Sequence, residues 1–291
     1  MLFQFPLSGE HGVFNSIPGT PQSNSRKITG VKIFSCIKPV VDPATRLVIN
    51  ESKTWIKTQD ATYVASEADN YALEEALRLR EKHNGEAIAL SLGGEEAAKV
   101  LRAGLAMGAD RAIQISDTNV RGATEFNVAE ALARAIEKDG GADLVLAGVQ
   151  SDDLGTGATG VMLAEFLGWS HATVAIAINA NPEAKTIQVE RELEGGVIES
   201  VELTLPAVVT VQYGANQPRY ASLKGIMAAK KKPFVVWSAG SDLGIAPADA
   251  MLETKELVVP EKKSRVEILS GTPEESVTLL VEKLRKEAKV L

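Results

Sequence analysis

A short strand, a glycine-bearing loop and the start of a helix follow one another within residues 143–167. Residues 144–147 form an apolar run that is too short for a helix and suits a buried strand. Residues 150–157 are mostly polar or small, and from Thr159 onward apolar residues recur at the spacing of one helix face. The first amide groups of a helix lack partners within it, so an anion can bind there. The stretch therefore predicts a strand-loop-helix unit that can hold a phosphate.

The composition of this loop narrows the kind of anion site. Gly155 and Gly157 let the backbone approach a ligand without collisions from a Cβ atom. The loop has no lysine, so it is not a Walker-type phosphate loop, and it does not spell GxGxxG. Two interpretations remain open for this stretch alone. One is a nucleotide phosphate or ribose site of another type, and the other is an ordinary turn between a strand and a helix.

Charge and composition exclude several classes of protein. A net charge of −7 over 291 residues argues against nucleic acid as the main partner. Cys36 is the single cysteine, so no disulfide can form within the chain, and we expect a reducing, cytoplasmic location. No apolar run approaches the roughly 20 residues of a membrane helix, so direct membrane insertion is not expected. The three histidines are widely scattered, and no metal-ligand spacing occurs.

Residues 1–30 are an atypical N-terminal extension, because their proline, glycine and aromatic residues follow no period. They lack the basic-then-apolar order of a secretory signal, and Arg26 and Lys27 are few for an organellar presequence. We favour a start of the native protein at Val31, since valine can be encoded by GTG, a bacterial start codon. Residues 25–27 can then be translated ribosome-binding sequence. An intact mass that includes residues 1–30 would contradict this.

Residues 31–168 alternate between predicted strands and helices. Strands are expected at 31–37, 86–92, 112–115 and 144–147, and helices at 66–84, 95–107 and 125–138, with a long loop at 41–66. Ser66 is expected to cap the first helix in a box with Asp69, and Asn84 to end it. Such units imply an α/β fold with a doubly wound, mostly parallel sheet and ligands at the carboxyl ends of its strands. Cys36, Ser66, Leu92 and residues 148–159 fall at those ends, which favours the nucleotide site.

The pattern changes after Trp169. Residues 186–193 and 197–205 alternate around a Glu-Gly-Gly turn and predict a β-hairpin, and residues 208–212 predict another strand. Beyond Ser238 the chain is expected to be polar and extended, until Thr272, Pro273 and Glu275 start a last helix with an apolar face. We therefore divide the chain into the extension 1–30, a nucleotide-binding domain 31–238 and a C-terminal docking arm 239–291.

No catalytic constellation is found in the sequence. Asp152 and Asp153 are adjacent and normally diverge, so helix capping or ribose binding is favoured over acid–base chemistry. Cys36, alone at a strand end, is more typical of buried filler than of a nucleophile. No histidine has an obvious partner.

From Val31 to its end the chain resembles the beta (small) subunit of electron-transfer flavoproteins. Residues 70–82 (NYALEEALRLREK) with 106–113 (AMGADRAI), residues 144–160 (LVLAGVQSDDLGTGATG) and residues 217–233 (QPRYASLKGIMAAKKKP) carry the resemblance. The last of these looks like the signature of the family. The resemblance implies a heterodimer with an alpha subunit that holds FAD, an AMP in the beta subunit, and an arm after Ser238 that wraps the alpha subunit.

The resemblance also implies which residues meet the ligand and the partners. By position, the AMP contacts fall on Cys36, Ser66, Leu92, Gly148, Val149, Gln150, Ser151, Asp153, Gly155, Thr156, Gly157, Ala158 and Thr159. The loop that anchors partner dehydrogenases carries Arg219, Tyr220, Leu223, Ile226 and Met227. From the residues alone, Leu223 is either buried beneath this loop, the more common fate of a leucine, or exposed on it. We favour the exposed position, because polar residues surround it.

Three functional hypotheses follow. The first is a non-catalytic carrier subunit that accepts electrons from acyl-CoA dehydrogenases through the partner's FAD and passes them to a membrane quinone oxidoreductase. The second is a subunit of a bifurcating enzyme that binds a second FAD in place of AMP and oxidises NADH. The third is a stand-alone nucleotide-binding regulator. Residues 144–160 differ from the version found in bifurcating relatives, so AMP is favoured.

Overall fold

The computed structural model describes residues 30–58, 61–116, 124–245, 254–260 and 266–291. The expected start at Val31 concerns residues 1–30, of which residues 1–29 lie outside the described part. The described chain divides into two compact units. One takes in residues 30–46 and the described part of 58–245, and the other takes in Leu47–Lys57 with the described part of Thr254–Leu291.

A nine-stranded sheet is the centre of the first unit among the described residues, in the order β11-β5-β4-β1-β6-β10-β7-β8-β9. The parallel strands are β1 (Lys32–Cys36), β4 (Glu86–Leu92), β5 (Arg111–Ser116), β6 (Leu144–Gly148), β7 (Ser170–Asn181), β10 (Ala207–Val211) and β11 (Phe234–Ser238). All strands in this set that the sequence predicts are present within two residues of their expected ends. The α/β class and the mostly parallel sheet are confirmed.

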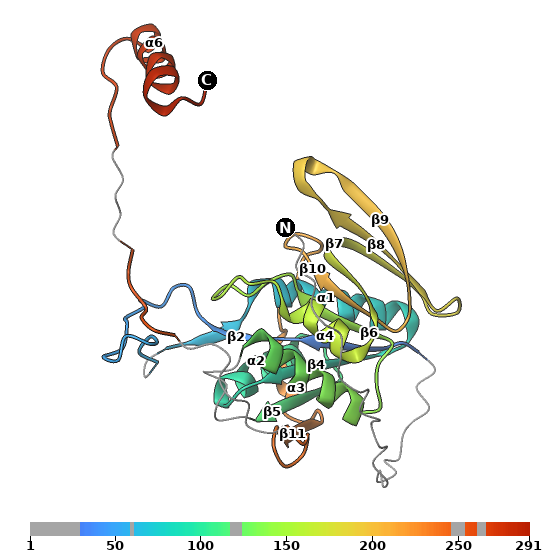
Figure 1. Cartoon of the computed structure of the whole chain (residues 1–291). Helices are drawn as coiled ribbons and strands as arrows, with labels where there is room; N and C mark the ends of the chain where they lie inside the picture. The colour runs from blue at the N-terminus through green and yellow to red at the C-terminus, as the bar shows by residue number, and fades with distance from the viewer. Residues whose placement is uncertain (1–29, 59–60, 117–123, 246–253, 261–265) are drawn as a thin grey trace, which may run out of the picture. The chain divides into compact units, whose positions relative to one another are not determined.

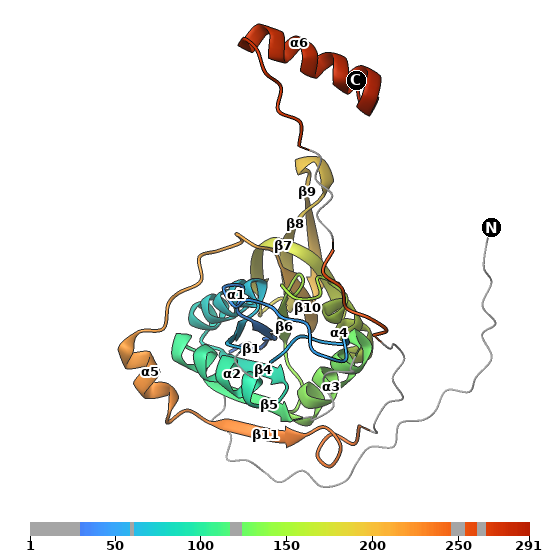
Figure 2. The ribbon, with the colours of Figure 1, turned by 90° about the vertical axis from the view of Figure 1, so that its left-hand side faces the viewer.

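Helices cover both faces of this sheet, as Figure 2 shows. The helices α1 (Glu67–His83) and α2 (Glu95–Met107) pack on one face, and α3 (Glu125–Lys138) and α4 (Thr159–Leu167) pack on the other. Neighbouring residues of a strand therefore enter separate cores, as Ile33 does on the α1 side and Phe34 on the α3 side. Burial on both faces explains why these strands are almost continuously apolar.

The order of the strands reverses beside β1. The chain runs from β1 through α1 to β4 and through α2 to β5 on one side, and β6 then pairs with the other edge of β1. In open parallel sheets, ligands bind outside the carboxyl ends of the strands at such a reversal. Strands β1 and β6 pair in parallel, so their carboxyl ends, at Cys36 and Gly148, lie at the same edge of the sheet. Figure 1 labels β6, and Figure 2 shows β1 next to it.

An antiparallel extension follows the parallel strands. The predicted hairpin is confirmed as β8 (Thr186–Glu192) and β9 (Ile198–Thr204), which pair antiparallel with each other. Strand β7 was not predicted from the sequence; it pairs parallel with β10 and antiparallel with β8. Its middle, residues 174–178, is continuously apolar, and alanine alternates with asparagine only at its end.

Two expected irregular stretches contain regular structure. The loop expected at 41–66 ends in the strand β3 (Tyr63–Ala65), which pairs with β2 (Pro39–Val41). The extended chain expected directly after Ser238 is wrong for residues 239–245, which form a turn with Ala239 and Leu243 buried in the α3-side core. These two apolar side chains hold the end of β11 on the sheet.

The second unit contains the C-terminal helix α6 (Pro273–Lys283), followed by a wider turn at Leu284–Ala288. The predicted capping box is confirmed, because Thr272 accepts from the amide of Glu275 while the Glu275 carboxylate accepts from the amide of Thr272. Val277 and Leu280 on α6 are exposed, at 60% and 46%. The described residues of this helix thus leave an apolar surface uncovered.

Candidate functional site

The buried carboxylate of Asp69 joins the two strand ends at the sheet reversal. It accepts the amide N–H of Lys38, just after β1, and the amide N–H of Gly148, at the end of β6, each at 2.8 Å. The expected capping box is therefore wrong, because the Ser66 side chain forms no cap hydrogen bond and Asp69 turns to the sheet. A Cβ on Gly148 would lie 2.7 Å from Ala68 Cβ and from Asp69 Oδ1, so only glycine fits.

The pKa of Asp69 is higher than is usual for an aspartate. Burial, the strongest influence, raises the pKa of Asp69 to about 7, against the two amide hydrogen bonds that lower it. From the sequence, Asp69 is expected only as part of a helix cap. The sequence signal for its buried position was a carboxylate near the start of an otherwise apolar helix face, opposite two strand ends.

The start of α1 is capped by a residue from the β6–α4 loop (residues 149–158). Asp152 Oδ2 accepts the amide N–H of Glu67 at 2.7 Å, and the amide of Asp152 donates to Ser66 Oγ at 3.2 Å. Tyr213 donates its hydroxyl to Asp152 Oδ1 at 3.1 Å. Burial and then this hydrogen bond raise the pKa of Tyr213 to about 12. The capping interpretation of Asp152 is confirmed, although the helix it caps is far away in sequence.

The other carboxylate of the loop is neutralised by a lysine that sequence analysis missed. Lys38 Nζ lies 2.7 Å from Asp153 Oδ1 and donates to Ser151 Oγ at 3.2 Å. Burial alone would raise the pKa of Asp153, but the hydrogen bonds from Lys38 and Ser151 outweigh it and lower the pKa. Both acidic side chains of the loop are thus paired with donors of the protein.

The start of α4 is free of competing acids. Its N-cap residue, Ala158, provides no side-chain hydrogen bond, and no acidic residue stands in the first turn. Gly155 and Gly157 have φ of 63° and 65°, where side chains with a Cβ are disfavoured. The first amide groups of α4 are therefore the kind of donors that bind an anion.

The residues expected at the nucleotide site lie along one edge of the sheet. Ser66 is joined to the β6–α4 loop by a hydrogen bond, whereas Leu92 ends β4, on the far side of β1 from that loop. Residues 152–156 are exposed, and Gly148, Val149, Ser151 and residues 157–159 are half-buried. Cys36 is buried, and burial together with the Asp69 charge raises its thiol pKa, so it is a poor nucleophile.

A second feature is the segment between β10 and β11, residues 212–233, which contains α5 (Leu223–Ala229). Tyr220 is 98% exposed, Leu223 79%, Met227 61% and Ile226 47%. Leu223 is therefore exposed in the described chain, as expected. Arg219, grouped with these residues by sequence, instead places its guanidinium on Glu74 and Glu81 of α1.

In the described ranges no group of three or more His, Cys, Asp or Glu side chains is arranged to hold a metal ion. None of the helices described is long and apolar enough to cross a membrane.

A doubly wound sheet with a glycine-bearing loop at its reversal is typical of nucleotide-binding α/β proteins. Residues 53–242 match the family model of the electron transfer flavoprotein domain. Three proteins named electron transfer flavoprotein subunit beta are similar: those of Bacillus subtilis, strain 168 (38% identity; 90% of this chain and 100% of that protein), Bos taurus (37%; 88% and 97%) and Methylophilus methylotrophus (33%; 87% and 97%). The chain belongs to the electron transfer flavoprotein family, as a beta subunit.

The family assignment gives this chain a part in electron transfer, as the beta subunit of an electron transfer flavoprotein. It thus favours the two electron-transfer hypotheses over the stand-alone regulator. A similar beta subunit of Arabidopsis thaliana is named mitochondrial.

Proposed function

We propose that this chain is the beta subunit of a heterodimeric electron carrier whose alpha subunit holds FAD, and that AMP binds as a structural ligand at the sheet edge where β1 and β6 end. The observation that carries the AMP proposal is the start of α4, where free amide groups meet a glycine-bearing loop with both of its acids paired. FAD supplies the redox chemistry from the alpha subunit.

The proposed AMP contacts come from the strand ends and the loop. The phosphate is assigned to the amide groups of residues 157–160, since a helix start stabilises an anion there. Ser66 and Ser151 are assigned hydroxyl contacts to the nucleoside. Cys36 and Leu92 contribute apolar surface at the ends of β1 and β4.

Refolding tests the structural role of AMP. A ligand that binds only the folded state stabilises it by mass action. Heterodimer refolded with FAD and AMP should therefore melt at a higher temperature than heterodimer refolded with FAD alone. Replacing Gly157 with a bulky residue should abolish this difference, because φ there is 65° and an added Cβ would lie 3.3 Å from Val149 O. Equal melting temperatures with and without AMP would reject the role.

We propose acyl-CoA dehydrogenases as electron donors and a membrane quinone oxidoreductase as acceptor. Support comes from the exposed apolar side chains of Tyr220, Leu223, Ile226 and Met227, which suit docking to another protein. A carrier that a purified acyl-CoA dehydrogenase fails to reduce would reject the donor class. Oxidation of NADH with two FAD per heterodimer would identify the bifurcating enzyme instead.

We propose that the C-terminal arm docks on the alpha subunit, since the exposed Val277 and Leu280 of α6 need a partner surface. Removal of residues 254–291 tests this more cleanly than truncation at Ser238, because Ala239 and Leu243 belong to the core of the first unit. The shortened chain should keep its melting temperature and bind the alpha subunit more weakly. Unchanged affinity would reject the docking role. The cytoplasmic location also remains a proposal, and it rests on the absence of disulfides from a chain with one cysteine.

A further inference from the structure

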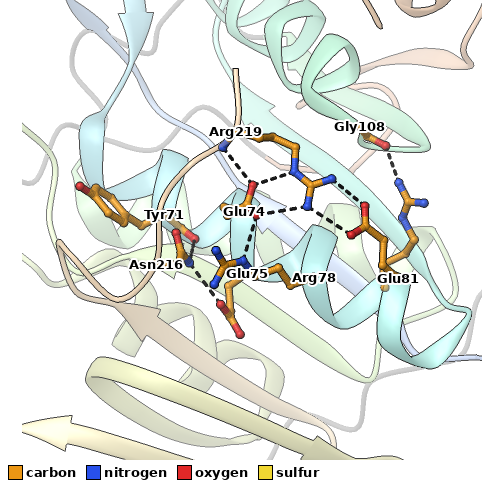
Figure 3. Close-up of polar contacts among 9 residues, drawn as sticks. Tyr71, Glu74, Glu75, Arg78, Glu81, Gly108, Asn216 and Arg219 are labelled. Carbon is orange, nitrogen blue, oxygen red and sulfur yellow. Dashed lines mark hydrogen bonds and ion pairs between the residues drawn. The ribbon is translucent and has the colours of Figure 1, made fainter. Parts of the chain in front are cut away.

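A single guanidinium connects the β10–β11 segment to helix α1. Arg219 donates to both oxygens of Glu74, at 2.8 and 3.1 Å, and to both oxygens of Glu81, at 2.6 and 3.2 Å (Figure 3). Its amide N–H also donates to Glu74, at 3.1 Å. Two carboxylates and one main-chain bond thus fix both the side chain and the backbone of this residue.

The sequence of α1 prepares this arrangement. Glu74, Arg78 and Glu81 recur at helical spacing and therefore share one face. Arg78 Nε donates to Glu74 Oε1 at 3.0 Å. The Glu74 side chain is only 4% exposed, and burial alone would raise its pKa, but the hydrogen bonds from Arg219 and Arg78 outweigh burial and lower it. A buried carboxylate of this kind requires its cations.

Other contacts hold the two sides of the segment. Asn216 Nδ2 donates to the carbonyl of Tyr71 at 3.0 Å and to Glu75 at 3.2 Å, again on α1. On the other side, a Cβ on Gly225 would lie 2.3 Å from Ala106 O, so α5 packs closely on α2. Arg219 is the last of the fixed points on α1 before the exposed side chains begin at Tyr220.

We infer that Arg219 is a positioning residue, whose bonds to Glu74 and Glu81 fasten the β10–β11 segment to α1 and so hold Tyr220 and Leu223 outward for the electron donor. The inference rests on the proposed docking role of this segment. It gives Arg219 a positioning role in place of a direct contact with the partner. The guanidinium faces its own chain, so the partner would meet the apolar side chains that follow it. A planar fork that binds two carboxylates at once is a function that lysine cannot reproduce.

Two matched variants test the inference in the purified heterodimer. Arg219→Ala and Arg78→Ala each remove one cation from Glu74, but Arg78 lies within α1, four residues from that carboxylate. Hydrogen exchange, read by mass spectrometry on a peptide covering residues 212–223, reports how firmly the segment is held. Exchange should become faster in Arg219→Ala and stay close to wild type in Arg78→Ala.

Steady-state reduction by an acyl-CoA dehydrogenase provides the second measurement. Arg219→Ala should raise the KM for the carrier roughly five- to tenfold at unchanged kcat. The reason is that Tyr220 and Leu223 remain present but are less firmly positioned for docking. Arg219→Lys should show a KM between those of wild type and Arg219→Ala, because lysine keeps the charge but not the planar fork. If Arg219→Ala is too unstable to purify, Glu81→Gln removes just the outer carboxylate and should cause a smaller change in the same direction.

The outcomes separate this inference from the docking proposal. Unchanged exchange in Arg219→Ala, or equal exchange in both variants, would overturn the positioning role. A raised KM in Leu223→Ala together with a wild-type KM in Arg219→Ala would overturn it as well. If Leu223→Ala leaves the KM unchanged, the docking proposal fails, and the exchange measurement still decides whether Arg219 holds the segment.

Discussion

The β6–α4 loop and the β10–β11 segment are both fixed to helix α1, but the loop presents backbone amides and the segment presents apolar side chains. The loop uses Asp152 to cap the start of α1 and pairs Asp153 with Lys38, which leaves backbone amides at the start of α4. In the segment, Arg219 forms an ion pair with Glu74 in the middle of α1, and the apolar side chains that follow stay exposed. A small anion needs closely spaced backbone donors, whereas a protein partner needs accessible apolar surface.

This difference predicts which substitutions matter in each region. In the loop, function depends on space around the backbone and on buried hydrogen bonds, so small changes of volume should be costly. In the segment, function depends on exposed side chains, so their removal should spare the fold.

The largest effect is expected at Gly148. Gly148→Ala places a Cβ 2.7 Å from Asp69 Oδ1 and 2.8 Å from the backbone carbon of Ala68, neither of which can move freely. We expect a loss of about 3 kcal/mol in the free energy of unfolding, the upper end for overpacking. Gly240→Ala is the control, because the nearest atom to its added Cβ is 3.9 Å away. Equal urea midpoints for the two variants would contradict the close approach of β6 to α1.

Asp69→Asn should cause the next largest loss. The amide side chain has one acceptor, so one of the amide groups of Lys38 and Gly148 is left without its partner. We expect about 2 kcal/mol of destabilisation, the usual cost of one unpaired buried donor. Urea unfolding at pH 7 measures it, and a variant as stable as wild type would show that the tie between β1 and β6 is unimportant.

The acidity of Asp69 also predicts a dependence on pH. An unfolded aspartate has a pKa near 4, and burial raises that of folded Asp69 to about 7. The folded state therefore binds more protons between about pH 4 and 7, and stability falls as pH rises through this window. Urea unfolding should show a larger fall from pH 5 to pH 8 in wild type than in Asp69→Asn. Equal falls would remove Asp69 as the cause.

Leu223→Ala should have the smallest effect on the fold. At 79% exposure its truncation should change the free energy of unfolding by no more than about 0.5 kcal/mol. Docking should lose about 1 kcal/mol, seen as slower reduction by an acyl-CoA dehydrogenase at limiting carrier with normal flavin content. The fully buried Leu77 is the contrast, since Leu77→Ala should cost roughly 2–5 kcal/mol. A lowered melting temperature with unchanged electron transfer would refute the anchor role of Leu223.

Periodicity predicted much of this fold, because apolar residues at buried positions recur at the spacing of a helix or a strand. Helices α2 and α3 have the predicted ends, and their stop signals are local, such as Gly108 after Met107. Strand β7 was missed, since its middle, residues 174–178, is a short apolar run that periodicity alone does not distinguish from a buried helix segment. Strand β11 was missed as well, although residues 234–237 are β-branched or aromatic and favour a strand.

The position of the candidate site at the sheet edge was predictable from the sequence, but the hydrogen bonds that build it were not. Strand ends and glycines locate the edge of the sheet from sequence alone. The bonds from Asp69 to Gly148 and from Asp152 to Glu67 join residues about 80 positions apart, and no local pattern encodes such pairs. The same reason applies to Arg219, whose partners Glu74 and Glu81 lie on a helix distant in sequence.

The nucleotide content of the native heterodimer tests the central claim most directly. Protein purified without added nucleotide is denatured, and the released nucleotides are separated and quantified against the protein. The proposed anion site at the β6–α4 loop predicts about one AMP and one FAD per heterodimer. Two FAD and no AMP would contradict the account.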